Sequence, residues 1–170
     1  MRCEIQLTGG YVATIDDEDF GVVADKKWYA LVRRDKSEKV LCVYAVRKVK
    51  RGMRWVNEYM HRLIMRPPNG HQVDHVDGDG LNNMRSNLRI CTNTENQWNK
   101  RNNCGVSTFR GVSRHHRGSL WVAKIRANGR RYYLGCYANP EDAAKAYDSA
   151  ALRLHGEFAR TNAKEVHHVQ

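Results

Sequence analysis

Short apolar segments bounded by glycine or charged residues make up the first third of the chain. The segments with this pattern are 5–7, 11–15, 28–33 and 41–49. Each is too short for a typical helix and rich in β-branched or aromatic residues, which favours strands. Gly9-Gly10 separates the first two and predicts a hairpin, while Asp16 is placed to cap a short helix that ends near Ala24. Residues 1–57 are therefore expected to form a small β-rich region.

A helix and a second hairpin are predicted next. Residues 58–65 carry apolar side chains at helical spacing, and the turn residues at 67–70 end this helix. Residues 72–76 and 88–91 are expected to pair as strands, because Asp77-Gly78-Asp79-Gly80 between them is strong turn sequence.

A capping box marks the start of the following helix. The sequence Thr92-Asn93-Thr94-Glu95 has the Thr-x-x-Glu pattern, so a helix is expected to begin there with Asn96 in its first turns. The helix is expected to end near residue 101, which makes 58–101 one module. Residues 102–108 are polar and lack periodicity, so they are interpreted as a linker.

Residues 109–162 show three strand-like segments followed by one helix. The middle segment, 121–126, alternates between an apolar face and a face that ends in Lys124 and Arg126. From residue 107 to residue 135 there are seven basic residues and no acidic one. The basic residues are Arg110, Arg114, Arg117, Lys124, Arg126, Arg130 and Arg131. This part of the chain is therefore expected to present a cationic sheet face.

The helix of this last region has recognisable ends. Asn139 is its expected N-cap, Pro140 occupies the first position, and Gly156 is expected to stop it. Mostly small residues form one stripe that lets the helix lie close to the sheet: Ala143, Tyr147, Ala150, Ala151 and Leu154. Residues 163–170 remain as a tail.

The chain of 170 residues is strongly basic, with 29 lysines and arginines against 18 aspartates and glutamates and a net charge of +11. This balance favours a nucleic acid partner. No stretch approaches the roughly eighteen apolar residues of a membrane span, and residues 1–11 lack the apolar core of a signal peptide. We therefore expect no membrane association and no secretion, and a protein that stays inside the cell that makes it.

Five cysteines stand at positions 3, 42, 91, 104 and 136, and no two of them form a Cys-x-x-Cys pair. Reduced thiols are expected rather than a disulfide framework. No structural zinc is expected either.

A basic run in the first region contains Arg47, Lys48, Lys50 and Arg51, with Gly52 as a turn. Runs of this kind are usually solvated hairpin tips. The alternative is contact with DNA phosphates, which the total charge favours. Both interpretations remain open at the sequence level.

The segment 71–100 holds an unusual density of groups that bind metals or transfer protons. Asp74 and His75 are adjacent, Asn87 precedes the second strand of the hairpin, and Asn96 follows the capping box. A neutral imidazole titrates near pH 6.5, roughly where a general base must work. A carboxylate and an amide oxygen suit Mg²⁺. Strand alternation would send Asp74 and His75 to opposite faces, so spacing alone does not place them at one site.

Simpler interpretations of the same residues also exist. Asp74, Asp77 and Asp79 alternate as in a calcium loop, but the bidentate glutamate of an EF-hand is missing because position 85 is arginine. An inert turn is the other possibility. His61 and His71 are open between a structural and a catalytic role.

Residues 58–101 resemble the HNH nuclease motif, in particular the HNH endonucleases of phage introns and free-standing phage homing genes. The resemblance is carried by His61-Arg62-Leu63-Ile64, Val73-Asp74-His75, Asn82-Asn83, Ser86-Asn87-Leu88-Arg89 and Glu95-Asn96-Gln97-x-Asn99. It implies a ββα-metal module in which His75 is the general base and Asn87 holds the hairpin loop and orients it. It also implies that Asp74 and Asn96 hold one Mg²⁺ or Mn²⁺ ion against the scissile phosphate.

Residues 109–162 closely resemble the AP2 DNA-binding domain. The motifs are Phe109-Arg-Gly-Val-Ser-Arg, Trp121-Val-Ala-Lys-Ile-Arg, Arg131-Tyr-Tyr-Leu-Gly-Cys-Tyr and Pro140-Glu-Asp-Ala-Ala-Lys-Ala-Tyr. AP2 domains lay a three-stranded sheet into the major groove, which implies DNA contacts from Arg110, Arg126, Arg131 and Tyr133. Arg114, Arg117 and Lys124 are expected on the same face. Ser113 and Lys124 depart from the arginine and glutamate common in plant transcription factors, so a target sequence does not carry over.

The predicted fold class is α+β, with a small β-rich region, a ββα-metal module and a three-stranded antiparallel sheet with one helix. The leading hypothesis is a site-specific homing-type endonuclease for double-stranded DNA, located in a bacterial cytoplasm if phage-encoded. A DNA-binding regulator with a decayed nuclease module is the alternative, and a sequence-indifferent nuclease is a third. The presence of Asp74, His75, Asn87 and Asn96 argues against decay. A monomer would nick one strand and a homodimer could cut both.

Overall fold

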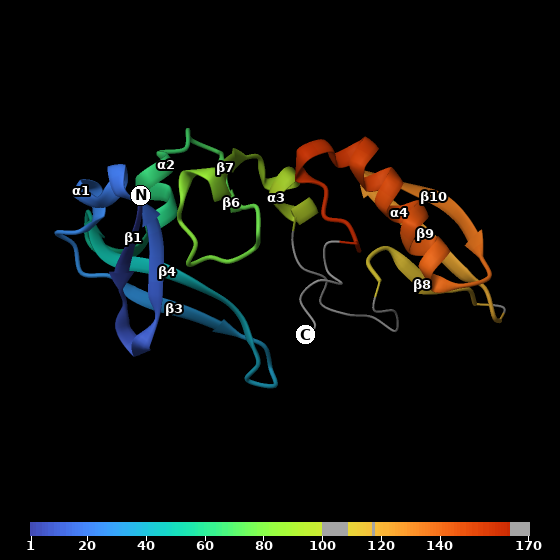
Figure 1. Ribbon diagram of the computed structural model, residues 1–170, viewed down its shortest axis with the longest axis horizontal. Helices are drawn as coiled ribbons and strands as arrows, with labels where there is room; N and C mark the ends of the chain where they lie inside the picture. Colours follow the sequence, from blue (N-terminus) through green and yellow to red (C-terminus); the bar gives the residue numbers. More distant parts are fainter. Residues whose placement is uncertain (100–108, 117, 164–170) are drawn as a thin grey trace. The chain divides into compact units, whose positions relative to one another are not determined.

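The computed structural model describes residues 1–99, 109–116 and 118–163, which belong to two compact units, Met1–Asn93 and Thr94–Gln170 (Figure 1). Helices are few, and the sheets are antiparallel with two or three strands each. The expected linker 102–108, Arg117, and the tail beyond residue 163 lie outside the described residues. None of the described helices is long and apolar enough to cross a membrane.

The first unit opens with the expected hairpin of β1 (Arg2–Gln6) and β2 (Val12–Asp16), joined by a 3₁₀ turn. A 3₁₀ turn at Asp17–Asp19 and the short helix α1 (Phe20–Val23) follow. The prediction that Asp16 caps this helix is wrong. Its carboxylate instead accepts a hydrogen bond of 2.7 Å from the backbone N–H of Arg85, far along the chain.

A three-stranded sheet comes next, in the order β3 (Tyr29–Arg34), β4 (Val40–Arg51) and β5 (Arg54–Tyr59). Strand β4 runs through the basic segment, and β5 is a strand that the sequence pattern did not reveal. The helix expected over 58–65 is therefore shorter, and α2 covers Met60–Met65. Glu58 and Tyr59 stay extended because they pair with Arg47 and Val46 across the ladder.

The second hairpin forms as predicted from β6 (Gln72–His75) and β7 (Leu88–Cys91). Asp74 lies opposite Arg89, and His75 lies opposite Leu88. A short 3₁₀ turn at Arg85–Asn87 leads into β7, and α3 (Asn93–Asn99) follows it. From Thr94 onward, α3 belongs to the second unit.

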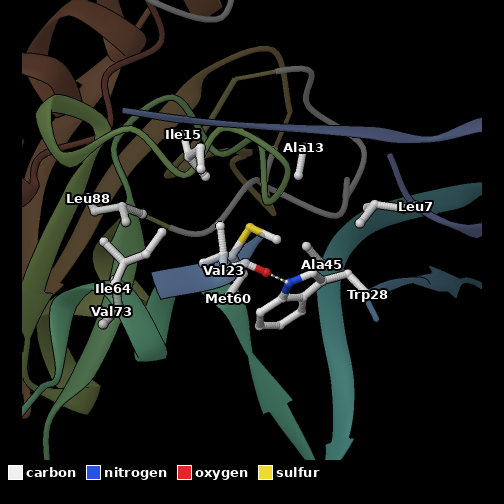
Figure 2. Close-up of a cluster of buried hydrophobic side chains, with 10 residues drawn as sticks. All are labelled: Leu7, Ala13, Ile15, Val23, Trp28, Ala45, Met60, Ile64, Val73 and Leu88. Carbon is white, nitrogen blue, oxygen red and sulfur yellow. Dashed lines mark hydrogen bonds between the residues drawn. The ribbon is translucent and has the colours of Figure 1, made fainter. Parts of the chain in front are cut away.

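One hydrophobic core organises the first unit (Figure 2). Its buried members are Leu7, Ala13, Ile15, Val23, Trp28, Ala45, Met60, Ile64, Val73 and Leu88. The indole N–H of Trp28 donates to the carbonyl of Val23 at 2.9 Å, so the polar atom of this large side chain is satisfied inside the core. Residues on both sides of the expected boundary at 57/58 contribute, and the β-rich region and the first part of the nuclease-like segment therefore fold around shared packing.

The turn after β6 lies close against β4. A side chain at Gly80 would place its Cβ 2.4 Å from the carbonyl oxygen of Val43 and 2.5 Å from the ring of Tyr44. Only glycine fits such an approach. The loop of the second hairpin is thus held against the three-stranded sheet.

The second unit contains the sheet β10-β9-β8 and one long helix. The strands are β8 (Val112–Arg114), β9 (Trp121–Ala127) and β10 (Arg130–Tyr137), and α4 (Pro140–His155) lies along one face of the sheet (Figure 1). The predicted helix ends are confirmed: Asn139 accepts the backbone N–H of Asp142 at 2.9 Å, and Gly156 follows the last residue with φ +56°. The stripe of small residues on α4 is buried against the sheet, with Leu154 partly buried beside it.

Candidate active site and nucleic-acid interface

A cluster of aromatic rings surrounds His75 at the end of β6. His75 is 5% exposed, and its ring meets the ring of His61 edge-on, with centroids 4.9 Å apart. Tyr44 lies 5.9 Å from His75 and 5.8 Å from His61, and Tyr59 lies 5.2 Å from His61. Strands β4, β5 and β6 and helix α2 therefore fix the imidazole of His75 from several sides.

Burial sets the protonation of both histidines. It lowers the pKa of His61 to about 3, with the nearby His75 and Arg62 acting in the same direction. Burial also lowers the pKa of His75, against a hydrogen bond with Asn83 and the charges of neighbouring aspartates. Both rings are therefore neutral near pH 7, and a neutral imidazole is the form that can accept a proton.

Asn87 closes the loop between β6 and β7. Its amide nitrogen donates to Asp77 Oδ1 at 2.9 Å and to the carbonyl of Asn82 at 2.8 Å, and its amide oxygen accepts the N–H of Asp77 at 3.0 Å. Sequence reasoning assigned no separate role to Asn83, which is fully buried and whose backbone N–H donates to the carbonyl of Thr14 at 2.7 Å. The sequence feature that could have pointed to Asn83 is the Asn82-Asn83 pair of the HNH-like motif.

The loop carboxylates serve the turn itself. Asp77 Oδ1 accepts the N–H of Asp79 at 2.8 Å, and Asp79 Oδ1 accepts the N–H of Leu81 at 3.0 Å. Asp77 Oδ2 also receives the Asn82 amide at 2.8 Å. These contacts favour a structural turn over a calcium loop.

Asp74 lies one position before His75 on β6, opposite Arg89 of β7, and its charge acts on His75. It is 7% exposed, and Arg89 opposite to it donates from Nε at 2.9 Å and from Nη2 at 2.6 Å, both to Oδ2. An ionised carboxylate is the donor that a divalent cation requires. Asp74 thus has suitable chemistry for Mg²⁺, with Arg89 as the cation that a metal ion must compete with. Asn96 lies half-buried in α3 of the second unit.

Helix α3 is tied to the second unit through its last turn. The ring of Trp98 stacks on His155, with centroids 4.3 Å apart and an angle of 9° between the planes. The carbonyl of Trp98 accepts Arg110 Nη2 at 2.9 Å, and the carbonyl of Asn99 accepts Arg160 Nη1 at 3.3 Å. The element that carries Asn96 is therefore anchored on the sheet-and-helix unit.

Arg110 is turned inward, in contrast to the exposed Lys124, Arg126 and Arg131 of the sheet. Besides Trp98, its guanidinium donates from Nε to the hydroxyl of Tyr147 at 2.8 Å. Gly111 beside it has φ +71°, and a Cβ there would meet the ring of Tyr147 at 2.0 Å. This corner of the sheet is built for close packing on α4.

The open face of the sheet carries exposed polar and cationic side chains. Arg126 lies opposite Arg131, and Lys124 lies opposite Tyr133, so cross-strand neighbours share this face. All four are exposed, Tyr133 to 62%. Arg114 pairs with Trp121 instead, and its guanidinium lies 5.0 Å from that indole ring. The seven basic residues therefore do not share one face, because alternation sends Arg114 to the other side.

The basic run of β4 divides in a similar way. Arg47 forms an ion pair of 2.5 Å with Glu58 and lies over the ring of Trp28, whereas Lys48 and Lys50 are exposed. Arg51 is 71% exposed and 3.4 Å from Glu58. The hairpin tip also exposes Met53 and Trp55, which the sequence analysis did not single out.

Comparison with known proteins separates two segments. Residues 58–98 match the model of an HNH endonuclease family, and residues 107–157 match the AP2 domain model. Relatives over the second segment include the ethylene-responsive transcription factor WRI1 of Arabidopsis thaliana, 52% identical over 60 residues, and the AP2-like ethylene-responsive transcription factor CRL5 of Oryza sativa subsp. japonica, 47% identical over 60 residues. These matches cover 34% of this chain but only 14% and 9% of the two relatives. The chain is thus similar to AP2 DNA-binding domains over one segment and to HNH endonucleases over the segment that carries the His75 cluster.

Proposed function

We propose that the chain is a metal-dependent DNA endonuclease of the homing type. The observation that carries the proposal is the buried, neutral His75, held in an aromatic cluster within the segment that matches HNH endonucleases. A proton acceptor in such a fixed position has no evident use in a protein that only binds DNA. The AP2 segment supplies a means of choosing where on double-stranded DNA the chemistry takes place.

His75 acts as the general base that removes a proton from the attacking water. Asn87 keeps the β6–β7 loop closed, and the hydrogen bond with Asn83 helps to orient the His75 ring. Asp74 and Asn96 are proposed to hold one Mg²⁺ or Mn²⁺ ion, which when bound stabilises charge on the phosphate. Arg89 pairs with the Asp74 carboxylate at 2.6 Å and orients it.

Site selection is proposed to rest on the open sheet face in the major groove. Arg126 and Arg131 have the planar donor geometry that reads guanine, and Tyr133 and Lys124 extend the same surface. Lys48, Lys50 and Arg51 of β4 add phosphate contacts, whereas Arg114 packs on Trp121 on the other side of the sheet. Arg110 and Arg47 already have protein partners, so we propose that both act chiefly in packing.

The direct test is incubation of the purified chain with supercoiled plasmid and Mg²⁺, with a matched sample containing EDTA. Metal-dependent nicked or linear product is expected, nicked for a monomer and linear for a homodimer. The plasmid carries a duplex selected for binding to the chain, and if this plasmid stayed intact under every metal tested, the nuclease proposal would be removed.

A sequence-specific DNA-binding regulator is the second candidate. It is favoured by one observation, namely that the curated relatives with the AP2 similarity are transcription factors. The same plasmid assay separates the two functions, because a regulator would bind a selected duplex without cutting it.

A further inference from the structure

A groove of about 370 Å³ lies between β5 and α2 in the first unit. Three arginines line it, Arg51 from the end of β4, Arg62 from α2 and Arg66 from the residue after α2. Tyr59 and Leu63 add apolar wall, and Glu58 is its acidic residue. Neither Arg62 nor Arg66 was among the expected DNA contacts.

The charge of the groove is positive despite Glu58. That carboxylate is already paired with Arg47 at 2.5 Å and with Arg51 at 3.4 Å. Arg62 uses Nη1 to donate to the carbonyl of His71 at 3.1 Å, and a guanidinium has five N–H donors in total. Arg62 lies on α2, Arg66 is the residue that follows the helix, and both are exposed and line the groove. Their guanidinium groups therefore retain donors for an anion.

Helix α2 connects this groove with the candidate base. One side of the helix buries Met60, His61 and Ile64, and the His61 ring contacts the His75 ring. The other side presents Arg62, Leu63 and Arg66 to the groove. Helix α2 thus contacts the His75 ring on one side and lines the groove on the other.

We propose that the groove binds a backbone phosphodiester of the DNA substrate next to the cleaved bond. Arginine forks match the paired oxygens of a phosphate, and apolar walls such as Tyr59 and Leu63 suit the sugar that follows it. This inference rests on the proposed function in one respect, that DNA is the substrate, and it adds the residues that hold the strand during cutting. The contact is to the backbone, so it is independent of base sequence.

The test uses the full chain with Arg62→Gln and Arg66→Gln combined. Glutamine at position 62 keeps a donor for the His71 carbonyl, so folding is preserved. Arg34→Gln is the control. Arg34 is an exposed arginine at the last position of β3, does not line the groove, and pairs with Glu38 at 3.8 Å. Affinity for cognate and scrambled duplexes is measured over a series of salt concentrations, with thermal melting as the check on folding.

The double variant is expected to weaken binding equally on both duplexes and to reduce the slope of log affinity against log salt by about 0.9, because one phosphate is no longer neutralised. The control keeps the slope of the wild type. An unchanged slope in the double variant would overturn the proposal. A second result would also overturn it. If inorganic phosphate raised the melting temperature of the wild type but not of the double variant, and both bound DNA equally, the groove would be a site for free phosphate.

The plasmid assay keeps the two proposals apart. If the wild type cuts DNA but the double variant retains the full salt slope, the groove fails and the nuclease stands. If the wild type does not cut but the double variant has a reduced slope, the groove stands as a DNA contact and the nuclease proposal fails.

Discussion

The His75 cluster and the open face of the AP2-like sheet use similar polar residues in opposite surroundings. His61, Asp74 and His75 are each less than a tenth exposed; burial lowers the pKa of both histidines, and Asp74 pairs with Arg89. Lys124, Arg126 and Arg131 are exposed on strands whose other face carries the packing. In the first region the candidate catalytic side chains are also part of the packing, whereas in the second the packing and the exposed cationic surface are carried by different side chains.

This difference predicts how substitutions behave. At the cluster, a change should affect folding, protonation and reaction together. On the sheet face, a change should affect binding and leave folding alone. The predictions below test this contrast, beginning with the largest expected effect.

Replacement of His75 by alanine should remove nearly all cleavage. A positioned general base contributes about 10²- to 10⁴-fold to the rate, so the single-turnover rate at saturating DNA should fall by at least that range. DNA affinity should stay near that of the wild type, because the exposed sheet face is untouched. His116→Ala, which changes an exposed histidine, is the control and should cut normally. A His75→Ala protein that cuts at the wild-type rate would exclude His75 as the base.

Replacement of Arg89 by alanine should destabilise the first unit. Its partner Asp74 has a side chain only 8% exposed, and a buried charge left without its partner costs about 3–5 kcal/mol. Urea unfolding followed by tryptophan fluorescence measures the change. Arg34→Ala breaks an exposed pair, with side chains 46% and 84% exposed, and should cost no more than about 1 kcal/mol. Equal losses in the two variants would show that the Asp74–Arg89 pair is not effectively buried.

Local signals predicted much of the fold. The Asn139-Pro140 start of α4 and the turn sequence between β6 and β7 depend on neighbours in the chain, and both elements form where expected. Strand β5 was missed because its stability comes from pairing with β4, and the overlap of Tyr59 with a helical pattern hid it. Asp16 was misread because its acceptor is used by Arg85, a residue that local sequence does not bring close.

The contacts of the candidate site residues could not be predicted from the sequence. The motif singled out Asp74 and His75 as candidates, whereas their partners Arg89 and His61 become visible only in the folded chain. The aromatic cluster around His75 needs side chains from distant strands, and no spacing rule brings Tyr44 to it. The inward turn of Arg110 depends likewise on Tyr147 and Trp98, so sequence position alone placed it with the exposed arginines.

Stability should fall in mild acid, in part because of His61. Its pKa is lowered from 6.5 to about 3 in the folded state by burial, so below about pH 6.5 the unfolded chain binds a proton that the folded chain does not. Each pH unit within this window costs up to about 1.4 kcal/mol, which gives roughly 2 kcal/mol at pH 5. Above about pH 6.5 the contribution vanishes.

Urea unfolding at several pH values, on the wild type and on His61→Phe, isolates this contribution. The variant should lose stability less steeply between pH 6.5 and 4, and His75, whose pKa is also lowered, accounts for part of the remaining slope. Parallel curves for the two proteins would mean that His61 is protonated in the folded state.

Replacement of Arg126 by alanine should weaken cognate binding by about 1–3 kcal/mol if this residue reads a base, with no change in melting temperature. Arg110→Ala provides the matched comparison within the same unit. It removes hydrogen bonds to Tyr147 and to the Trp98 carbonyl, so it should lower the melting temperature, and its effect on binding should follow from impaired folding. Competition with scrambled duplexes completes the test, because equal losses on cognate and scrambled DNA would make Arg126 a phosphate contact. If Arg110→Ala instead melts like the wild type and loses only cognate affinity, Arg110 turns outward on DNA, and the contrast between packing and reading residues in this sheet disappears.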